Sequence, residues 1–328
     1  MELNTSQAHE WIAARLGVRP EDLRTAALGG GVSNHVVLAE SGGMRWVFKQ
    51  SLEKLRVAQE WRSRRDRIWV ECAALRAMAG VLPAGSVPRV LLEEREEHVF
   101  AMEAAPEGCM PWKTALLAGE VRREIAVWAG SLQGTWIRES ARHPEWAQAF
   151  GDLTVFGELR VDPYYRSTAA RYPELAERFA SLIRECAQRR ISLVHGDFSP
   201  KNLLAGGGAM MVIDWEVAHW GDPAFDGGFL TNHLLLKALR RPAAWTEYEG
   251  AAGAFWEAAR AEAGAGYDWL EGAAMRHLGC LLLARVDGKS PVEYIEEDAM
   301  KEKIRGVARG LITSPAKTHR EAFERAAA

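Results

Sequence analysis

Two short apolar runs interrupt a helical stretch of the sequence, and an acidic residue follows each of them. The run at residues 192–194 leads to Asp197, and the run at residues 210–213 leads to Asp214. Short apolar runs with β-branched residues are typical of buried strands. Asn202 adds a carboxamide oxygen five residues after Asp197. These positions predict a cluster of carboxylate and amide oxygens where two strands end.

This oxygen-rich cluster is suited to a phosphate group held by a metal ion. Carboxylate and amide oxygens are the preferred ligands of Mg²⁺, which keeps several waters and bridges substrate phosphates. Earlier in the chain, three consecutive glycines at 29–31 allow backbone N–H groups to approach a phosphate closely. Lys49, at the end of an aromatic apolar run, supplies a positive charge for the same phosphates. Together these parts are the ones that phosphoryl transfer requires.

Glu71 lies in a segment with helical periodicity. Ile68 and Leu75 recur at helical spacing within residues 66–79, so Glu71 falls on an apolar stripe. A carboxylate that is buried without a cation carries a desolvation cost of several kcal/mol. Two interpretations remain open: Glu71 pairs with Lys49, 22 residues earlier, or it lies at the edge of the stripe and reaches water.

The pattern along the chain predicts an α+β fold, with a small sheet-bearing N-terminal lobe and a larger, mainly helical C-terminal lobe. The glycine turn is expected to join two strands of a hairpin, and residues 104–108, with a proline and a glycine, form the expected linker. We therefore expect one lobe at residues 1–103 and the other at residues 104–328, with a ligand cleft between them. The expected helices are 7–16, 66–79, 119–139, 173–189, 224–240, 252–263 and 268–286, and the expected strands are 44–49, 87–92, 98–102, 192–194 and 210–213.

Composition argues against several functional classes. The 328 residues include 41 basic and 44 acidic side chains, so the chain lacks the basic field that holds a nucleic acid. The four cysteines form no CxxC pair, which disfavours a disulfide framework or a thiolate metal site and favours a reducing compartment. We find no secretory signal pattern and no uninterrupted apolar run of about 18 residues. The expected protein is cytoplasmic and has no nucleic-acid or membrane partner.

The order of these motifs resembles the protein-kinase-like fold, and above all its bacterial small-molecule branch, the aminoglycoside phosphotransferase and choline kinase superfamily. That branch has His-Gly-Asp in its catalytic loop, as at 195–197, and Ile-Asp-x-Glu at its metal strand, as at 213–216. It continues with Gly-Asp-Pro-x-x-Asp, as at 221–226. The resemblance covers about residues 25–235. Segments that are also similar to methylthioribose kinases are 48–51, Trp61, 67–71 and 225–230.

The resemblance implies an ATP- and Mg²⁺-dependent kinase that moves the γ-phosphate to a hydroxyl group of a small molecule. Asp197 would be the catalytic base, and Lys201 would be either a cation for the γ-phosphate or a solvated side chain. Asn202 and Asp214 would hold Mg²⁺, and Glu216 would be a metal partner or an acceptor contact. The nucleotide would contact the glycine turn, the Lys49–Glu71 pair and the hinge: Gly29, Gly30, Gly31, Ser33, Asn34, Lys49, Glu71, Met102, Glu103 and Ala105.

Two further residues and two segments have less specific interpretations. The resemblance implies that Asp226 braces the catalytic loop and that His195 is structural. The polar segment 283–291 either lines the acceptor side or forms a solvated helix end at Gly288. The basic stretch 56–67 is interpreted as a solvated face.

Two other functions remain open at this point. A metal-dependent hydrolase would use His195, Asp197, Asp214, His219 and Asp222 as a metal cluster that activates water. A catalytically silent kinase-like module would bind a nucleotide without transferring phosphate. The acceptor is equally open among an aminoglycoside-type antibiotic, a methylthioribose-like sugar and an amino alcohol, and the sequence predicts no oligomeric state.

Overall fold

The computed structural model of the protein describes residues 2–3, 7–29, 33–56 and 61–328. The chain forms two compact units. The first consists of Met1–Glu107 and Met211–Glu216, and the second of Gly108–Met210 and Val217–Ala328. Within the described ranges, no helix is both long enough and apolar enough to cross a membrane.

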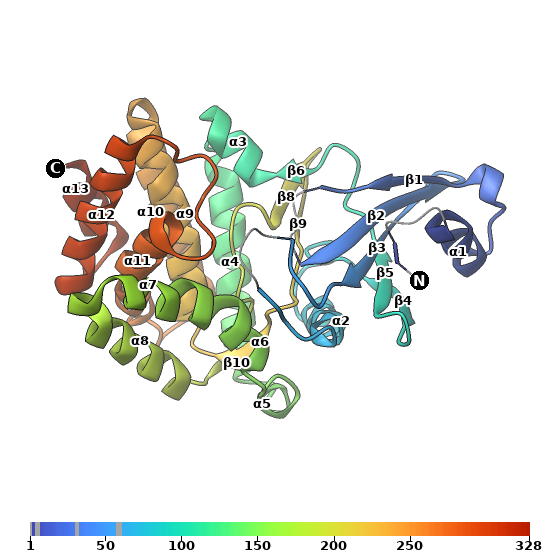
Figure 1. Ribbon diagram of the computed structural model, residues 1–328, viewed down its shortest axis with the longest axis horizontal. Coiled ribbons are helices and arrows are strands. Elements are labelled where there is room, and N and C mark those ends of the chain that lie inside the picture. Colours follow the sequence, from blue (N-terminus) through green and yellow to red (C-terminus); the bar gives the residue numbers. More distant parts are fainter. Residues whose placement is uncertain (1, 4–6, 30–32, 57–60) are drawn as a thin grey trace. The chain divides into compact units, whose positions relative to one another are not determined.

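The first unit contains a five-stranded antiparallel sheet of spatial order β1-β2-β3-β5-β4 (Figure 1). Its strands are β1 (Arg24–Ala27), β2 (Asn34–Ser41), β3 (Met44–Ser51), β4 (Val90–Glu94) and β5 (Val99–Glu103). The pairing of β1 with β2 confirms the hairpin expected around the glycine turn. The strands expected at 44–49, 87–92 and 98–102 are present as β3, β4 and β5, with ends shifted by at most three residues.

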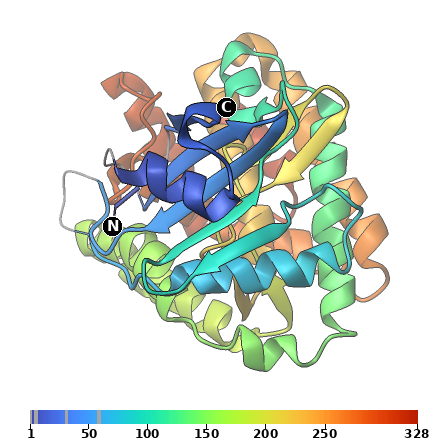
Figure 2. The ribbon, with the colours of Figure 1, turned by 90° about the vertical axis from the view of Figure 1, so that its right-hand side faces the viewer.

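Helices cover both faces of this sheet (Figure 2). Side chains alternate between the faces of a strand, so Phe48 and Lys49 on β3 point in opposite directions. Phe48 lies in the apolar core that includes Ile12 of α1 (Gln7–Leu16). Lys49 instead contacts Glu71 of α2 (Arg67–Ala79). One face therefore carries the apolar core with α1, and the other carries a charged pair with α2.

The second unit is mainly helical. Its α-helices are α3 (Trp112–Ala118), α4 (Arg123–Ser140), α5 (Trp146–Ala149), α6 (Thr154–Phe156), α7 (Ser167–Arg171), α8 (Ala176–Gln188), α9 (Ala224–Arg240), α10 (Trp245–Ala263), α11 (Leu270–Asp287), α12 (Asp298–Thr313) and α13 (His319–Ala327). A π-helix, Gly157–Arg166, joins α6 to α7. Short 3₁₀ helices are Pro20–Asp22, in the first unit, and Pro173–Leu175 and Pro242–Ala244. The helices expected at 173–189, 224–240, 252–263 and 268–286 are present, whereas α12 and α13 were not among those expected.

Short strands frame the motifs of the second unit. β7 (Ser192–Val194) pairs with β10 (His219–Gly221), and β6 (Met110–Pro111) pairs with β8 (Leu203–Gly206), which is followed by β9 (Ala209–Val212). The strands expected at 192–194 and 210–213 are confirmed. Together with the sheet of the first unit and the helices of the second, they confirm the α+β class.

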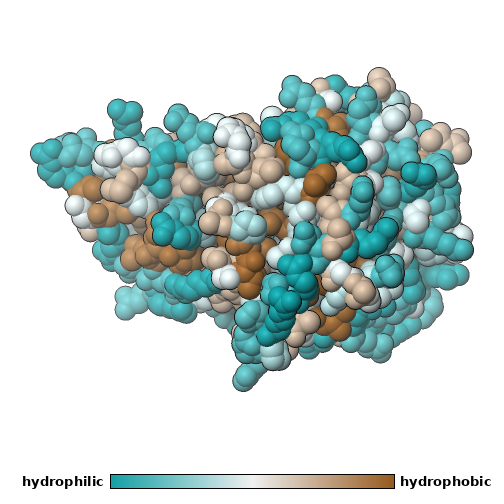
Figure 3. Space-filling model, turned by 180° about the vertical axis from the view of Figure 1, so that it is seen from behind, coloured by the Kyte–Doolittle hydropathy of each residue, from teal (hydrophilic) through white to brown (hydrophobic). Residues whose placement is uncertain are grey.

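The surface is that of an ordinary folded protein. The face drawn in Figure 3 is mainly hydrophilic, with smaller hydrophobic areas between the polar side chains. Among the described residues, the exposed large hydrophobic side chains are Leu28, Met44, Leu91, Met110, Val127 and Ile191. Scattered exposure of this kind is normal and marks no partner.

Candidate active site

Lys49 is the centre of a buried ionic cluster in the first unit. The side chain is 4% exposed, and its Nζ lies 2.6 Å from Glu71 Oε2 and also bonds Asp214 Oδ1. Glu71 is completely buried. The structure thus confirms the interpretation that Glu71 pairs with Lys49 and excludes the one in which it reaches water.

The electrostatics of this cluster keep Lys49 positively charged. Burial by itself would lower the pKa of Lys49, but the carboxylates of Asp214 and Glu71 outweigh it and raise that pKa above its ordinary value. A fixed, permanently charged ammonium group on a rigid strand is the geometry needed to hold a phosphate.

Asp214, two residues after the end of β9, has an unusual backbone conformation. Its φ is +69°, in the left-handed region that residues other than glycine adopt rarely, mostly where the surrounding structure forces them. Oxygens of Glu71, Asp214 and Glu216 lie within 4.8 Å of one another, and Glu71 Oε1 is buried without a hydrogen-bond partner. This donor set fits a hard divalent cation such as Mg²⁺.

Glu216 anchors the start of β2 beside the glycine turn. It accepts hydrogen bonds from Ser33 Oγ at 2.6 Å and from Asn34 Nδ2 at 2.8 Å, and Arg67 Nε lies 3.1 Å from its Oε2. Ser33 and Asn34 are therefore positioned by Glu216. Of the glycines in the turn, Gly29 is described, while Gly30 and Gly31 lie outside the described residues.

The expected hinge follows β5. Met102 and Glu103 are the last two residues of β5. The side chain of Glu103 forms a hydrogen bond with Arg89, and this bond lowers the pKa of Glu103. Ala105 O accepts a hydrogen bond from Arg45 Nη1 at 2.9 Å, so that carbonyl is already engaged.

Asp197 is the centre of a second cluster, in the second unit, on the loop after β7. The residue is 4% exposed. Asn202 Nδ2 donates to Asp197 O at 2.9 Å and to Asp197 Oδ2 at 3.0 Å, and Lys201 Nζ lies 2.8 Å from the same Oδ2. Because Asn202 donates both of these hydrogen bonds through Nδ2, its Oδ1 is the atom that can serve as a metal ligand.

The loop that carries Asp197 is braced by Asp226, as expected. The two carboxylate oxygens of Asp226 accept hydrogen bonds from His195 N at 2.7 Å and Gly196 N at 2.9 Å. His195 in turn accepts a hydrogen bond from Asp197 N through Nδ1 at 3.1 Å. Gly196 has a φ of +77°, and a Cβ added there would lie 2.6 Å from Val217 O, so the loop requires glycine.

Comparison with known proteins decides the family. The sequence model of the phosphotransferase enzyme family matches residues 24–273. The chain belongs to the phosphotransferase enzyme family. The matched residues include both clusters, from the glycine turn through Asp226.

Relatives of the chain within this family are methylthioribose kinases. The methylthioribose kinase of Geobacillus sp. (strain WCH70) is 27% identical over 272 residues, 73% of this chain and 66% of that protein. Methylthioribose kinase 2 of Oryza sativa subsp. japonica is 24% identical over 258 residues, 68% of this chain and 59% of that protein. The match thus spans about three fifths to two thirds of the length of these relatives.

Solved structures of small-molecule kinases share the fold. A choline/ethanolamine kinase family protein from Mesorhizobium loti matches 98% of both chains with a TM-score of 0.57 and 14% identity. The amicoumacin kinase hAmiN matches 94% of this chain and 96% of its own, with a TM-score of 0.54 and 15% identity. The phosphotransferase therefore has the two-lobed protein-kinase-like fold that the motifs predict.

Two arginines in these clusters were not identified from the sequence. Arg67 is completely buried: it bonds Glu216 and the carbonyl oxygens of Ser33 and Leu52. The interpretation of residues 56–67 as a solvated face is therefore wrong at Arg67. Arg160, from the π-helix, places Nη2 3.1 Å from Asp197 Oδ2, and no sequence motif pointed to it.

The metal cluster of the hydrolase hypothesis is not assembled. Among the described residues, the sets of three or more metal-ligating side chains with ligand atoms within 4.8 Å are Glu71, Asp214, Glu216 and Cys186, Asp222, His277. His219 stacks on Phe156 instead, at 4.1 Å between ring centroids. Asp222 bonds Arg189 Nη1 at 2.7 Å. Neither belongs to a site with Asp197.

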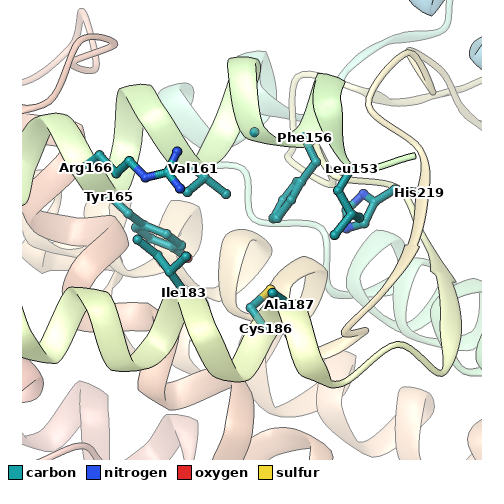
Figure 4. Close-up of a pocket in the computed structure, with 10 residues that line it drawn as sticks. Leu153, Phe156, Val161, Tyr165, Arg166, Ile183, Cys186, Ala187 and His219 are labelled. Carbon is teal, nitrogen blue, oxygen red and sulfur yellow. The ribbon is translucent and has the colours of Figure 1, made fainter. Parts of the chain in front are cut away.

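A separate cavity of about 180 Å³ lies in the second unit (Figure 4). Its lining is largely apolar, with Leu153, Phe156, Val161 and Ile183 among the side chains that face it. His219 also borders the cavity, and burial lowers the pKa of that imidazole to about 4. None of the predicted catalytic, nucleotide-binding or metal-binding residues lines it, so the cavity is not part of the candidate active site.

Proposed function

We propose that this phosphotransferase moves the γ-phosphoryl group of ATP to a hydroxyl group of a small molecule in a Mg²⁺-dependent reaction. The observation that carries the proposal is the buried Lys49, fixed between Glu71 and Asp214 and kept charged by them. Family membership and the similarity to named kinases support it. Residues 1–103 are proposed as the nucleotide-binding lobe and residues 104–328 as the catalytic and acceptor-binding lobe.

In this proposal the nucleotide is held by rigid elements of the first lobe. Lys49 contacts its phosphates, with Glu71 orienting the ammonium group. Backbone groups of the turn at 29–31 would cover the phosphates, and Ser33 and Asn34, which follow the turn, are hydrogen-bonded to Glu216. The hinge at Met102, Glu103 and Ala105 receives the base through backbone groups.

The reacting hydroxyl is activated in the second lobe. Asp197 accepts its hydrogen bond and takes its proton as the hydroxyl oxygen attacks the γ-phosphorus in line. Asn202 holds the Asp197 side chain in one orientation, while Lys201, already beside Asp197, supplies positive charge where the phosphoryl group is transferred.

Mg²⁺ would be held by the carboxylate of Asp214 and the carboxamide oxygen of Asn202, with Glu216 as a further partner. When bound, it supplies positive charge that neutralises the phosphates. Glu216 also has a second role, since its hydrogen bonds to Ser33 and Asn34 tie the metal-binding segment to the glycine turn.

The relatives support more than one class of acceptor. Methylthioribose-like sugars are supported by the named kinases at 24–28% identity, while aminoglycoside-type antibiotics and amino alcohols are supported by the wider superfamily. The alternative of a silent binding module is not favoured by any observation, because the base, the lysine and the metal acids are all present.

Titration of the protein with Mg·ATP by calorimetry tests the proposal. Wild type should bind Mg·ATP, and Asp214→Asn should lower the affinity at least about ten-fold, since it removes a charged metal ligand. Asp22→Asn is the matched control, because Asp22 is an exposed carboxylate of the first unit that pairs with Arg19. Equal affinities of wild type and Asp214→Asn would contradict the proposed metal role, and no binding by wild type would contradict the function.

A further inference from the structure

Five basic side chains from five different segments of the second unit form a connected group, and two of them contact Asp197. We call them the basic cluster: Lys113 of α3, Arg160 of the π-helix, Lys201 of the catalytic loop, Lys237 of α9 and Arg285 of α11. Their convergence from separate elements shows that the fold, and not a local run of basic residues, concentrates the charge.

Contacts link the basic cluster to the proposed catalytic base. Arg160 and Lys201 both contact Asp197 Oδ2, at 3.1 Å and 2.8 Å. The ring of Tyr164 contacts two guanidinium groups, with Arg160 at 5.8 Å and Arg285 at 5.5 Å from its centroid. The Tyr164 hydroxyl accepts a hydrogen bond from Arg285 Nη1 at 2.9 Å. Arg285 is therefore one aromatic ring away from the arginine that touches Asp197.

Lys237 is more deeply buried than Arg160, the other buried member of the cluster. It is 1% exposed, and its Nζ contacts two neutral oxygens, His233 O at 3.2 Å and the Tyr294 hydroxyl at 3.3 Å. In the described part of the chain, neither Lys237 nor Arg285 has a carboxylate within 4 Å. Arg285 Nε is likewise buried without a hydrogen-bond partner.

The electrostatic environment agrees with these contacts. Burial lowers the pKa of Lys237 well below its ordinary value, and Lys113 and Arg285 lower it further, against a smaller opposing effect of Glu293. The pKa of His233 is lowered by burial and then by Lys237, Arg285, Lys201 and Lys113. All of the charges that act on His233 in this way are positive.

Two carboxylates that contact the cluster, Asp197 and Glu293, are already paired with its members. Asp197 pairs with Arg160 and Lys201, and Glu293 pairs with Lys113. Neither of them forms an ion pair with Lys237 or Arg285. Cations in this arrangement repel a cationic ligand and are stabilised by an anionic one.

We propose that the acceptor of this phosphotransferase carries a carboxylate or phosphate group, which Lys237 and Arg285 bind while its hydroxyl group reaches Asp197. This rests on the function proposed above. It disfavours polycationic antibiotics and cationic amino alcohols as acceptors and favours hydroxy acids, sugar acids and sugar phosphates. The polar segment 283–291, which contains Arg285, thereby lines the acceptor side.

Matched sugars that differ only in charge provide the test. Glucuronate, glucose and glucosamine share one ring and carry a negative, no and a positive charge, and ribose 5-phosphate is compared with ribose for a phosphate group. Binding to the full-length protein is measured by calorimetry without nucleotide. At least one anionic sugar should bind about ten-fold or more tightly than its neutral counterpart, the effect of one charge-assisted hydrogen bond. The comparison of glucuronate with ribose 5-phosphate distinguishes carboxylate from phosphate recognition.

Substitutions assign the effect to the two residues. Arg285→Gln and Lys237→Met should each abolish the preference for the anionic sugar, whereas Arg276→Gln, on the same helix but paired with Glu185, should keep it. Lys237→Met replaces an already buried side chain with an apolar one of similar length and should fold.

The proposal is overturned if no anionic sugar binds, if glucose or glucosamine binds as tightly as glucuronate, or if both substitutions leave the preference unchanged. Binding of Mg·ATP, measured in parallel, separates this result from the function itself. A protein that binds anionic sugars but not Mg·ATP would retain the acceptor inference as a binding site and refute the kinase. A protein that binds Mg·ATP but prefers neutral or cationic sugars would retain the proposed kinase function and refute the acceptor inference.

Discussion

Lys49, Arg67 and Asp197 are charged side chains with 4% exposure or less, and each one is held by a partner of opposite charge. Removing one member of a buried pair leaves the other uncompensated, at a cost of about 3–5 kcal/mol. The ionic partners at each cluster are therefore part of the fold as well as of the proposed chemistry.

The imidazole of His277 makes a pH-dependent contribution to stability. It is buried, its Nδ1 lies 2.7 Å from the Tyr165 hydroxyl, and burial lowers its pKa to about 3. The unfolded histidine titrates near pH 6.5, so the unfolded chain binds a proton there that the folded chain does not. The free energy of unfolding should thus fall as the pH drops below about 6.5, and this loss should level off below about 3.

Urea unfolding of wild type and His277→Gln measures this contribution. Between about pH 7 and pH 5, wild type should lose about 2 kcal/mol more than the variant, whose glutamine does not titrate. Equal losses in the two proteins would show that His277 is protonated in the folded state.

The residue-level predictions succeeded where a short motif fixes the geometry. The family resemblance implied the Asp226 brace, and the Lys49–Glu71 pair was one of two interpretations that the helical periodicity left open; the structure contains both contacts. Arg67 could not be interpreted correctly because its partner, Glu216, is 149 residues away in the sequence. Arg160 reaches Asp197 only because a π-helix directs it there, and the sequence carries no signal for that.

At the scale of elements, α4 and α10 pack at unusually close range (Figure 1). A Cβ added at Gly130 would lie 2.2 Å from Phe255 O, and one added at Gly134 would lie 2.4 Å from Ala259 O. These two glycines, one helical turn apart on α4, allow the backbones to approach. The close packing fixes the helices around the second unit's core.

Gly134→Ala should therefore destabilise the protein by about 1–3 kcal/mol, since the backbones must move apart to accept the methyl group. Gly250→Ala, on α10, is the matched control: nothing lies within 4 Å of an added Cβ there. The control should raise stability by up to about 1 kcal/mol, because alanine favours the helix. Thermal and urea unfolding of both variants measure the change in the free energy of unfolding. Equal changes in the two variants would contradict the close packing of α4 and α10.

The elements found from the sequence are the ones with long periodic or strongly apolar segments. α8, α9, α10 and α11 were expected, and so were β3, β5 and β7. The strands β6, β8 and β10, of two to four residues each, were not expected. Their pairing depends on partners distant in sequence, such as Leu193 opposite Trp220.

At the scale of the whole molecule, the proposed chemistry is divided between the two units. The first contributes Lys49, Glu71 and Asp214, and the second contributes Asp197 and Asn202. Asp214 belongs to a six-residue segment of the first unit, Met211–Glu216, that is inserted in the sequence of the second. Phosphoryl transfer as proposed would require side chains from both units.

The most direct test of the proposed kinase activity is product formation. Wild type and Asp197→Asn are incubated with Mg·ATP and a small-metabolite extract supplemented with aminoglycosides, methylthioribose and glucuronate, and untargeted mass spectrometry identifies phosphorylated products. We expect a product with wild type and at least about a hundred-fold less with Asp197→Asn, the loss typical of a missing general base. No new phosphorylated product from a wild-type protein that binds Mg·ATP, or equal product from both proteins, would contradict the proposed mechanism.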